Sequence, residues 1–170
     1  MNESPEAPLV VAMGVSGAGK STIGALVADA LGVAFVDGDA LHPLANVQKM
    51  AAGTPLTDDD RWPWLAKVGR ALADAEGNGL VVACSALKRA YRDAILAEAS
   101  TAIFLLLSGS REVLSRRLEG RSGHFMPASL LDSQLATLEP LQSDERSVIV
   151  DIDAPVDQVV AAAVAGVRAA

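Results

Sequence analysis

The clearest signal in this chain is the run Gly14-Val15-Ser16-Gly17-Ala18-Gly19-Lys20-Ser21, which matches the pattern G-x-x-x-x-G-K-[ST]. The glycines let the backbone curl so that successive N–H groups point at phosphate oxygens. Lys20 is then placed for the β- and γ-phosphates, and the Ser21 hydroxyl for Mg²⁺. The run predicts a nucleoside triphosphate site, and the alternative is an ordinary glycine-rich turn between a strand and a helix.

The segments around this run alternate between strand and helix patterns. Residues 9–13 form a short apolar run that is typical of a strand buried on both faces, and residues 23–31 repeat apolar side chains at helical spacing. Further strands are expected at residues 33–36, 80–84, 102–107 and 148–150. Further helices are expected at about residues 43–52, 87–97, 110–118 and 156–167. One more is expected to begin at Asp60 as its N-cap and to end at the glycines at positions 77 and 79. This alternation predicts an α/β fold with helices on both faces of a parallel sheet.

Composition limits the classes of function. The chain has 170 residues, which suits a single domain over residues 9–170 after a short tail, residues 1–8, that is expected to be disordered. Its formal net charge of −7 argues against a nonspecific nucleic-acid or anionic-membrane binder. With Cys84 as the single cysteine and no apolar run near the roughly 18 residues of a membrane span, we expect a cytoplasmic protein.

Two carboxylates follow the second expected strand. Asp37 and Asp39 flank Gly38 at the carboxyl end of that strand, where the ligand crevice of an open α/β sheet lies. One carboxylate is expected to join the Mg²⁺ shell, and the other to accept a hydrogen bond or proton from an attacking hydroxyl. The alternative is a polar turn. Further along, Arg61 lies beside two tryptophans and is a candidate for contact with an anionic acceptor.

Several longer stretches resemble one family. Beyond the phosphate loop, the most specific are Asp37-Gly38-Asp39-Ala40-Leu41-His42-Pro43 and Gly123-His124-Phe125-Met126-Pro127. Cys84-Ser85-Ala86-Leu87-Lys88-Arg89, Tyr91-Arg92-Asp93, Ser133-Gln134 and Val150-Asp151-Ile152 agree as well. On these stretches the chain resembles the bacterial-type gluconokinases over about residues 9–155.

The resemblance implies a fold and a reaction. The fold would be a three-layer P-loop kinase fold like that of shikimate and nucleoside monophosphate kinases, with a five-stranded parallel sheet in the order 2-3-1-4-5. A mobile lid at about residues 121–137 would exclude water. The protein would be a homodimer that converts ATP and D-gluconate to ADP and 6-phospho-D-gluconate. A kinase for another small hydroxy acid such as shikimate, and a nonenzymatic nucleotide-binding module, remain alternatives.

The resemblance also implies roles on the nucleotide side. ATP would bind to the loop residues from Gly14 through Thr22, with Lys20 and the loop amides stabilising phosphate charge. Arg121 would reach the phosphates when the lid closes, and Arg117 would lie against adenine. Ser21 would ligate Mg²⁺, with Asp37 in the outer shell of the ion.

On the acceptor side, Asp39 would orient or deprotonate the C6 hydroxyl. Arg61 and Arg92 would bind the carboxylate and hydroxyls of gluconate, because a guanidinium matches a carboxylate bidentately. His42 and His124 would hydrogen-bond hydroxyls. The net charge does not oppose two anionic substrates, because seven of the fourteen basic residues lie between Lys88 and Arg121.

Overall fold

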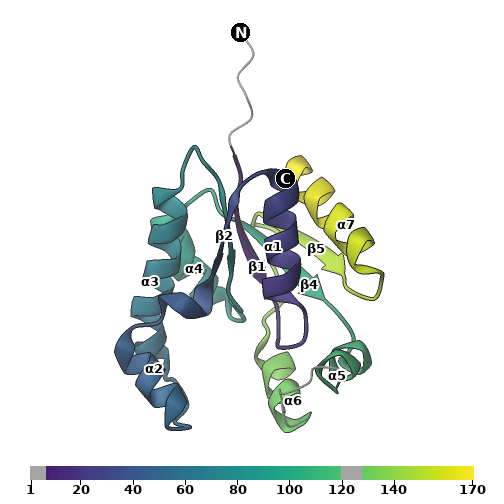
Figure 1. Ribbon diagram of the computed structural model, residues 1–170. Helices are drawn as coiled ribbons and strands as arrows, with labels where there is room; N and C mark the ends of the chain where they lie inside the picture. Colours follow the sequence, from purple (N-terminus) through teal and green to yellow (C-terminus); the bar gives the residue numbers. More distant parts are fainter. Residues whose placement is uncertain (1–6, 120–127) are drawn as a thin grey trace.

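A parallel sheet forms the centre of the computed structural model, which describes residues 7–119 and 128–170 (Figure 1). Its strands are β1 (Leu9–Met13), β2 (Ala34–Asp37), β3 (Leu80–Ala83), β4 (Ile103–Ser108) and β5 (Ser147–Asp151). They pair in the order β2-β3-β1-β4-β5, and every pair is parallel. The predicted α/β class and strand order are therefore confirmed.

Helices cover both faces of the sheet and create two hydrophobic cores. α1 (Lys20–Leu31) and α7 (Val156–Ala169) pack on one face, and α3 (Asp58–Asp74) and α4 (Arg89–Glu98) pack on the other (Figure 1). The central strand β1 supplies both cores by alternation, because Val10 and Ala12 join the first core while Val11 and Met13 join the second. All five residues of β1 are buried, as its continuous apolar run predicts.

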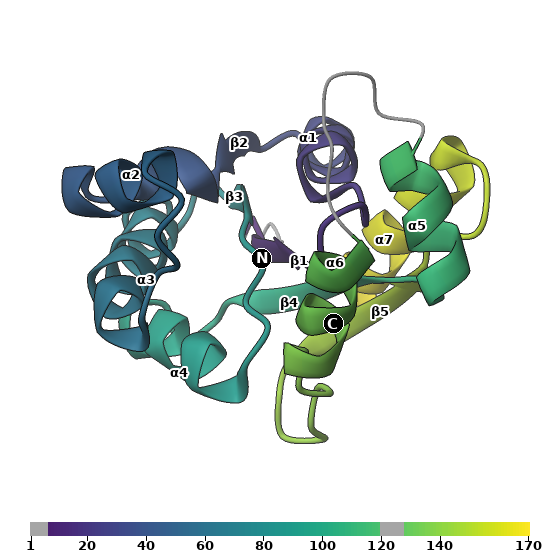
Figure 2. The ribbon, with the colours of Figure 1, turned by 90° about the horizontal axis from the view of Figure 1, so that it is seen from below.

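All the strands end at the same edge of the sheet, and the remaining helices gather there. Figure 2 looks at this end and shows α2 (Leu44–Ala51) on one side of the sheet, with α5 (Arg111–Glu119) and α6 (Ala128–Thr137) on the other. A 3₁₀ turn, η1 (Gly38–Leu41), joins β2 to the α2 side. The sequence did not predict α6. The lid expected at about residues 121–137 includes part of the undescribed segment 120–127, and its mobility stays a prediction.

The residue that caps the amino-terminal end of α3 differs from the one that the sequence predicted. Asp60, the predicted cap, instead takes part in a reciprocal hydrogen-bonded pair and also links α3 to α2. Thr57, and not Asp60, is the N-cap: its Oγ1 accepts from the Asp60 N–H at 3.2 Å, while Asp60 Oδ2 accepts from the Thr57 N–H at 2.9 Å. Lys49 of α2 donates to the same carboxylate at 2.7 Å. The Lys49 and Thr57 hydrogen bonds lower the pKa of Asp60 to about 2.

Among helices in the described ranges, none is long and apolar enough to cross a membrane.

Candidate active site

The phosphate loop occupies the turn between β1 and α1, at the carboxyl edge of the sheet. Gly19 caps α1 with a left-handed backbone, φ 86°, which favours glycine. Lys20 curls back over the loop, and its Nζ donates to the Val15 carbonyl at 3.1 Å. A Cβ on Gly17 would lie 2.9 Å from Leu118 Cγ, so α5 packs directly on the loop. The loop thus lies between a buried strand and a helix, as its sequence pattern predicts, and the phosphate-binding role of Lys20 stays a prediction.

Asp37 and Asp39 separate into two positions. The Ser21 hydroxyl donates to Asp37 Oδ2 at 3.0 Å, which places Asp37 beside the start of α1. The other oxygen of Asp37 accepts from the Asp39 N–H at 3.0 Å, and the Asp39 side chain is exposed at the edge. A hydroxyl and a carboxylate are the hard oxygen ligands that Mg²⁺ takes together with substrate phosphates. No three His, Cys, Asp or Glu residues in the described part of the chain gather as a metal cluster.

Close packing locks the turn between these two carboxylates. A Cβ on Gly38 would lie only 2.3 Å from the Ala83 carbonyl oxygen, so only glycine fits against the end of β3. The indole N–H of Trp64 in α3 donates to the Gly38 carbonyl at 2.8 Å. Buried Cys84 follows β3, and burial raises its thiol pKa to about 12, with Lys20 and Asp39 acting on it in opposite directions.

His42 stands next to this turn as a neutral hydrogen-bond donor. Its ring stacks on Trp64, with centroids 4.1 Å apart and an angle of 16°. The Asn46 amide nitrogen donates to the Asp60 carbonyl at 2.9 Å and lies 3.2 Å from His42 Nδ1. Nδ1 is thus the acceptor, and the ring proton is on Nε2. Burial lowers the pKa of His42, the Asp39 carboxylate opposes this, and Arg61 adds to it.

Two cations share one aromatic wall on the acceptor side. The Arg61 guanidinium and the Lys88 ammonium each lie 5.6 Å from the centre of the Tyr91 ring. The Tyr91 hydroxyl donates to Asp58 at 2.6 Å, and Arg61 reaches the same carboxylate oxygen at 3.4 Å. Sequence reasoning missed Lys88 and Tyr91, because no local spacing indicates that α3 and α4 bring them to Arg61. The only available signal was their place in the family-like stretches.

Arg92 does not fit the substrate-binding role that the resemblance implied. Its side chain is fully buried, and its guanidinium donates to Glu145 at 2.6 Å and 3.2 Å. It also donates to the carbonyls of Ala86 and Leu87 and to those of residues 139 and 140. These bonds engage all three guanidinium nitrogens. Arg92 holds the loop after β3, where Ala86 has the unusual φ of 46°.

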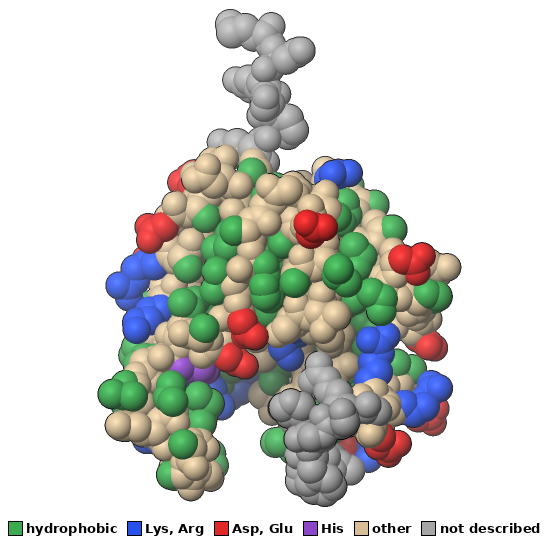
Figure 3. Space-filling view, viewed as in Figure 1, with side chains coloured by type: hydrophobic (Ala, Val, Ile, Leu, Met, Phe, Trp, Pro, Cys, Tyr) green, Lys and Arg blue, Asp and Glu red, His purple; other side chains and the backbone are tan. Residues whose placement is uncertain are grey.

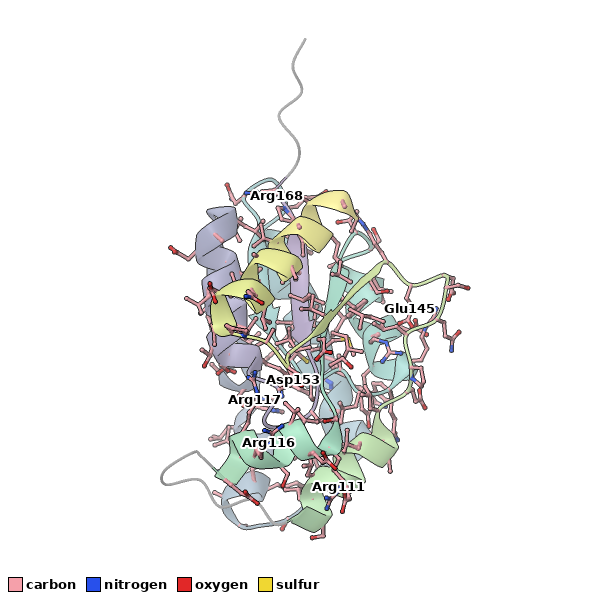
Figure 4. All side chains as sticks on the ribbon, turned by 90° about the vertical axis from the view of Figure 1, so that its right-hand side faces the viewer. Arg111, Arg116, Arg117, Glu145, Asp153 and Arg168 are labelled. Atoms are coloured by element: carbon pink, nitrogen blue, oxygen red, sulfur yellow. The ribbon has the colours of Figure 1, made fainter. Side chains whose placement is uncertain are left out.

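Arg117 lies between the phosphate loop and a cavity of about 490 Å³ beyond β5. Its guanidinium donates to the Ile152 carbonyl, and its Nη1 is 3.8 Å from where a Cβ on Gly19 would lie. Figure 4 shows Arg117 beside Asp153, where α5 meets the segment after β5. The cavity is lined by Val113, Arg116, Arg117, Ile152, Asp153, Ala154 and Pro155. Arg121 and His124, also predicted for the site, lie outside the described residues.

The phosphate loop, the Asp-Gly-Asp turn and the acceptor-side cations therefore share one end of the molecule. Figure 3 shows that this end is hollowed and that basic side chains lie within the hollow. The arrangement joins a phosphate-binding loop, oxygen ligands for a divalent cation, an exposed carboxylate and a cationic, hydrogen-bonding wall. Such a site can hold a nucleotide and an anionic polyol side by side.

The chain is similar to several known proteins in sequence and in fold. The shikimate kinase family profile matches residues 16–165. The chain is 51% identical over 138 residues to the gluconokinase of Gluconobacter oxydans (strain 621H), covering 80% of this chain and 78% of that protein. It is 43% identical over 159 residues to the thermoresistant gluconokinase of Escherichia coli (strain K12), covering 92% and 91%. A crystal structure of a gluconokinase from Sinorhizobium meliloti 1021 superimposes with a TM-score of 0.86 at 50% identity, covering 95% of this chain and 92% of that one.

Proposed function

The chain belongs to the gluconokinase family, and from this membership and the site geometry we propose that it transfers the γ-phosphoryl group of ATP to the C6 hydroxyl of D-gluconate. The products are ADP and 6-phospho-D-gluconate. One observation carries the proposal: the Asp37 carboxylate accepts from Ser21 of the phosphate loop, while the side chain of Asp39, two residues on, is exposed near His42, whose pKa its charge raises. The phosphoryl donor and the acceptor hydroxyl would therefore meet at this turn.

The nucleotide half of the site follows from the loop and its neighbours. The loop amides and Lys20 bind the phosphates, because N–H groups and an ammonium near a helix amino terminus stabilise negative charge. Arg117 places its guanidinium between Gly19 and the cavity beyond β5, which suits a nucleobase with its phosphates at the loop. Arg121 is proposed to add a further positive charge to the phosphates.

Ser21 and Asp37 are the residues that would hold Mg²⁺. Their oxygens lie 3.0 Å apart at the loop, which fits a hard cation that otherwise coordinates phosphate oxygens and water. A bound Mg²⁺ would neutralise charge on the β- and γ-phosphates. Asp37 itself orients the Ser21 hydroxyl and, through its second oxygen, the Asp39 backbone.

The acceptor half performs the proton transfer. The C6 oxygen forms a bond to the γ-phosphorus while the bond to the β–γ bridging oxygen breaks, the hydroxyl proton passes to Asp39, and ADP leaves. His42 donates from Nε2 to a hydroxyl of the acceptor. Arg61, joined by Lys88 across the Tyr91 ring, binds the carboxylate, because two cations on one wall favour an anion there. His124 is proposed as a further hydroxyl contact.

A coupled assay of ADP release tests the proposal across gluconate, shikimate, glycerate and nucleoside monophosphates. We expect turnover with gluconate far above the others, whereas a rate at background would contradict the proposed reaction. Preference for shikimate would favour another hydroxy-acid kinase, and no turnover with any acceptor would favour a binding module.

Asp39→Asn should lower kcat by about 10²–10⁴-fold, because it removes the proton acceptor, with ATP affinity nearly intact.

A homodimer in the cytoplasm completes the proposal. The family resemblance is its support, and the acidic, single-cysteine composition is compatible with a reducing compartment. Light scattering on the purified protein tests the assembly: a mass twice the 17.5 kDa of one chain is expected, and a concentration-independent monomer would contradict it.

A further inference from the structure

One side chain outside the predicted site reaches the phosphate loop. Gln134 lies in α6, and its Oε1 accepts a hydrogen bond of 2.7 Å from the backbone N–H of Ser16. The two residues are 118 positions apart in sequence, and the contact is partly buried. The sequence predicts phosphate oxygens as the partners of the loop amides. This amide instead has a protein oxygen as its acceptor.

The contact acts on the peptide group that also holds Lys20. The Val15 carbonyl, which accepts from Lys20 Nζ at 3.1 Å, belongs to the same planar peptide unit as the Ser16 N–H. In a trans peptide the carbonyl and the N–H point in opposite directions, so fixing one fixes the other. A rotation of this peptide would turn the carbonyl away from Lys20 and the N–H away from Gln134 together.

Contacts on several sides of α6 hold the helix in the position from which Gln134 reaches the loop. Leu131, one turn before Gln134 on the same helical side, is 1% exposed and belongs to the first hydrophobic core. Asp132 pairs with Arg111 of α5 on the outside of the helix. Just after the helix, the backbone N–H of Glu139 donates to the Leu87 carbonyl at 2.7 Å. Although α6 falls within the segment expected to form a lid, these contacts hold it on both sides in this structure and present Gln134 to the loop.

We propose that Gln134 is a positioning residue for phosphoryl transfer: it fixes the Val15–Ser16 peptide and so sets where the Lys20 ammonium lies. The inference rests on the proposed function, because it assigns Lys20 to the phosphates of ATP. A neutral carboxamide suits this task. A carboxylate would accept the same hydrogen bond but would bring a negative charge beside the triphosphate.

Two substitutions and a matched control test the inference. Gln134→Ala removes the acceptor, and we expect kcat to fall about tenfold, the factor that one ordinary hydrogen bond supports, with the KM for gluconate and the melting temperature near wild type. Gln134→Glu restores the acceptor but adds charge. The Gln134→Glu variant should recover much of the loss in kcat, but its affinity for ATP should fall more than its affinity for ADP. Gln158→Ala, an exposed glutamine of α7, should match wild type.

The outcomes separate this inference from the proposed function. A wild-type kcat in Gln134→Ala overturns the inference and leaves the reaction intact. A lower melting temperature in Gln134→Ala, with full recovery of every constant in Gln134→Glu, overturns it too, because that pattern indicates structural support alone. If the wild type does not phosphorylate gluconate, the proposed function fails. ATP affinity then decides the inference: a loss in Gln134→Ala and none in Gln158→Ala supports it, and equal affinities overturn it.

Discussion

Asp37 and Asp39 lie two residues apart, yet they contact different partners. The Asp37 carboxylate bridges the Ser21 hydroxyl and the Asp39 N–H, each at 3.0 Å. The Asp39 side chain is exposed at the edge that also carries His42. The sequence placed both carboxylates at the end of a strand, but it left open which one faces the cation. Only the approach of Ser21, a residue of another element, separates the two.

This separation predicts a different defect for each carboxylate. In Asp37→Asn the Mg²⁺ concentration for half-maximal activity should rise several-fold, because a neutral amide is a weaker partner for a hard cation. Asp39→Asn, the isosteric control, should leave that concentration unchanged and lower kcat. Mg²⁺ titrations at saturating ATP and gluconate measure both constants. An unchanged Mg²⁺ requirement in Asp37→Asn would remove Asp37 from the cation site.

At the scale of elements, the local sequence pattern predicted the strands and helices whose formation depends on neighbouring residues alone. The apolar run of β1 and the helical spacing of α1 need no distant partner, and both were predicted close to their observed bounds. α6 was missed because Leu131 and Gln134 are its inward contacts and their partners are far along the chain. Asp60 was mistaken for a cap because Thr57 and Asp60 form a reciprocal pair, in which both residues are good caps.

Arg92 shows the same limit in a single side chain. An arginine in a family-like stretch suggested a ligand for an anionic substrate, yet its partner is Glu145, 53 residues away. The pair joins α4 to the segment between α6 and β5, and both side chains are fully buried. The role of Arg92 is therefore to hold these elements together, and its effect on the acceptor is indirect, through the loop after β3.

Breaking this buried pair should destabilise the fold. Arg92→Met removes the nearest charge partner of the buried Glu145 carboxylate and leaves it with the Gln142 N–H at 2.7 Å and the more distant Arg89 at 3.8 Å. We expect a loss of about 3–5 kcal/mol in the free energy of unfolding. Adding Glu145→Leu should restore much of that loss, because the uncompensated charge is then gone. Urea unfolding measures all three proteins. A loss in Arg92→Met of only the size typical of exposed sites would contradict the buried role.

The same pair predicts how stability responds to acid. Burial is the largest single effect and raises the pKa of Glu145, but the Arg92 and Gln142 hydrogen bonds and the positive charges of Arg92 and Arg89 together outweigh it and leave the pKa below the ordinary 4.5. The folded state therefore binds this proton less tightly than the unfolded state does. The contribution is complete above pH 4.5 and is lost as the pH falls below that value. In the doubly substituted protein, the unfolding free energy should depend less steeply on pH in this range.

For the whole molecule, the net charge is −7, yet several of its basic side chains gather at the candidate site. Lys20, Arg61, Lys88 and Arg117 all lie at the carboxyl edge of the sheet, around the phosphate loop and the Tyr91 wall. Charges interact across about 10 Å at moderate ionic strength, so a substrate in the hollow meets these side chains more strongly than it meets the acidic side chains on distant surfaces.

A pair of variants with equal net charge tests this view. Lys88→Gln and Arg168→Gln each change the net charge from −7 to −8. Lys88 lies 5.6 Å from the Tyr91 ring centre in the acceptor wall, whereas Arg168 lies near the opposite end of the molecule (Figure 4). If local charge governs binding, Lys88→Gln should raise the KM for gluconate several-fold at low salt, and the increase should shrink at high salt because screening weakens the wild-type attraction too. Arg168→Gln should leave the KM unchanged at every salt concentration. Equal increases in both variants would instead assign the attraction to the charge of the whole molecule.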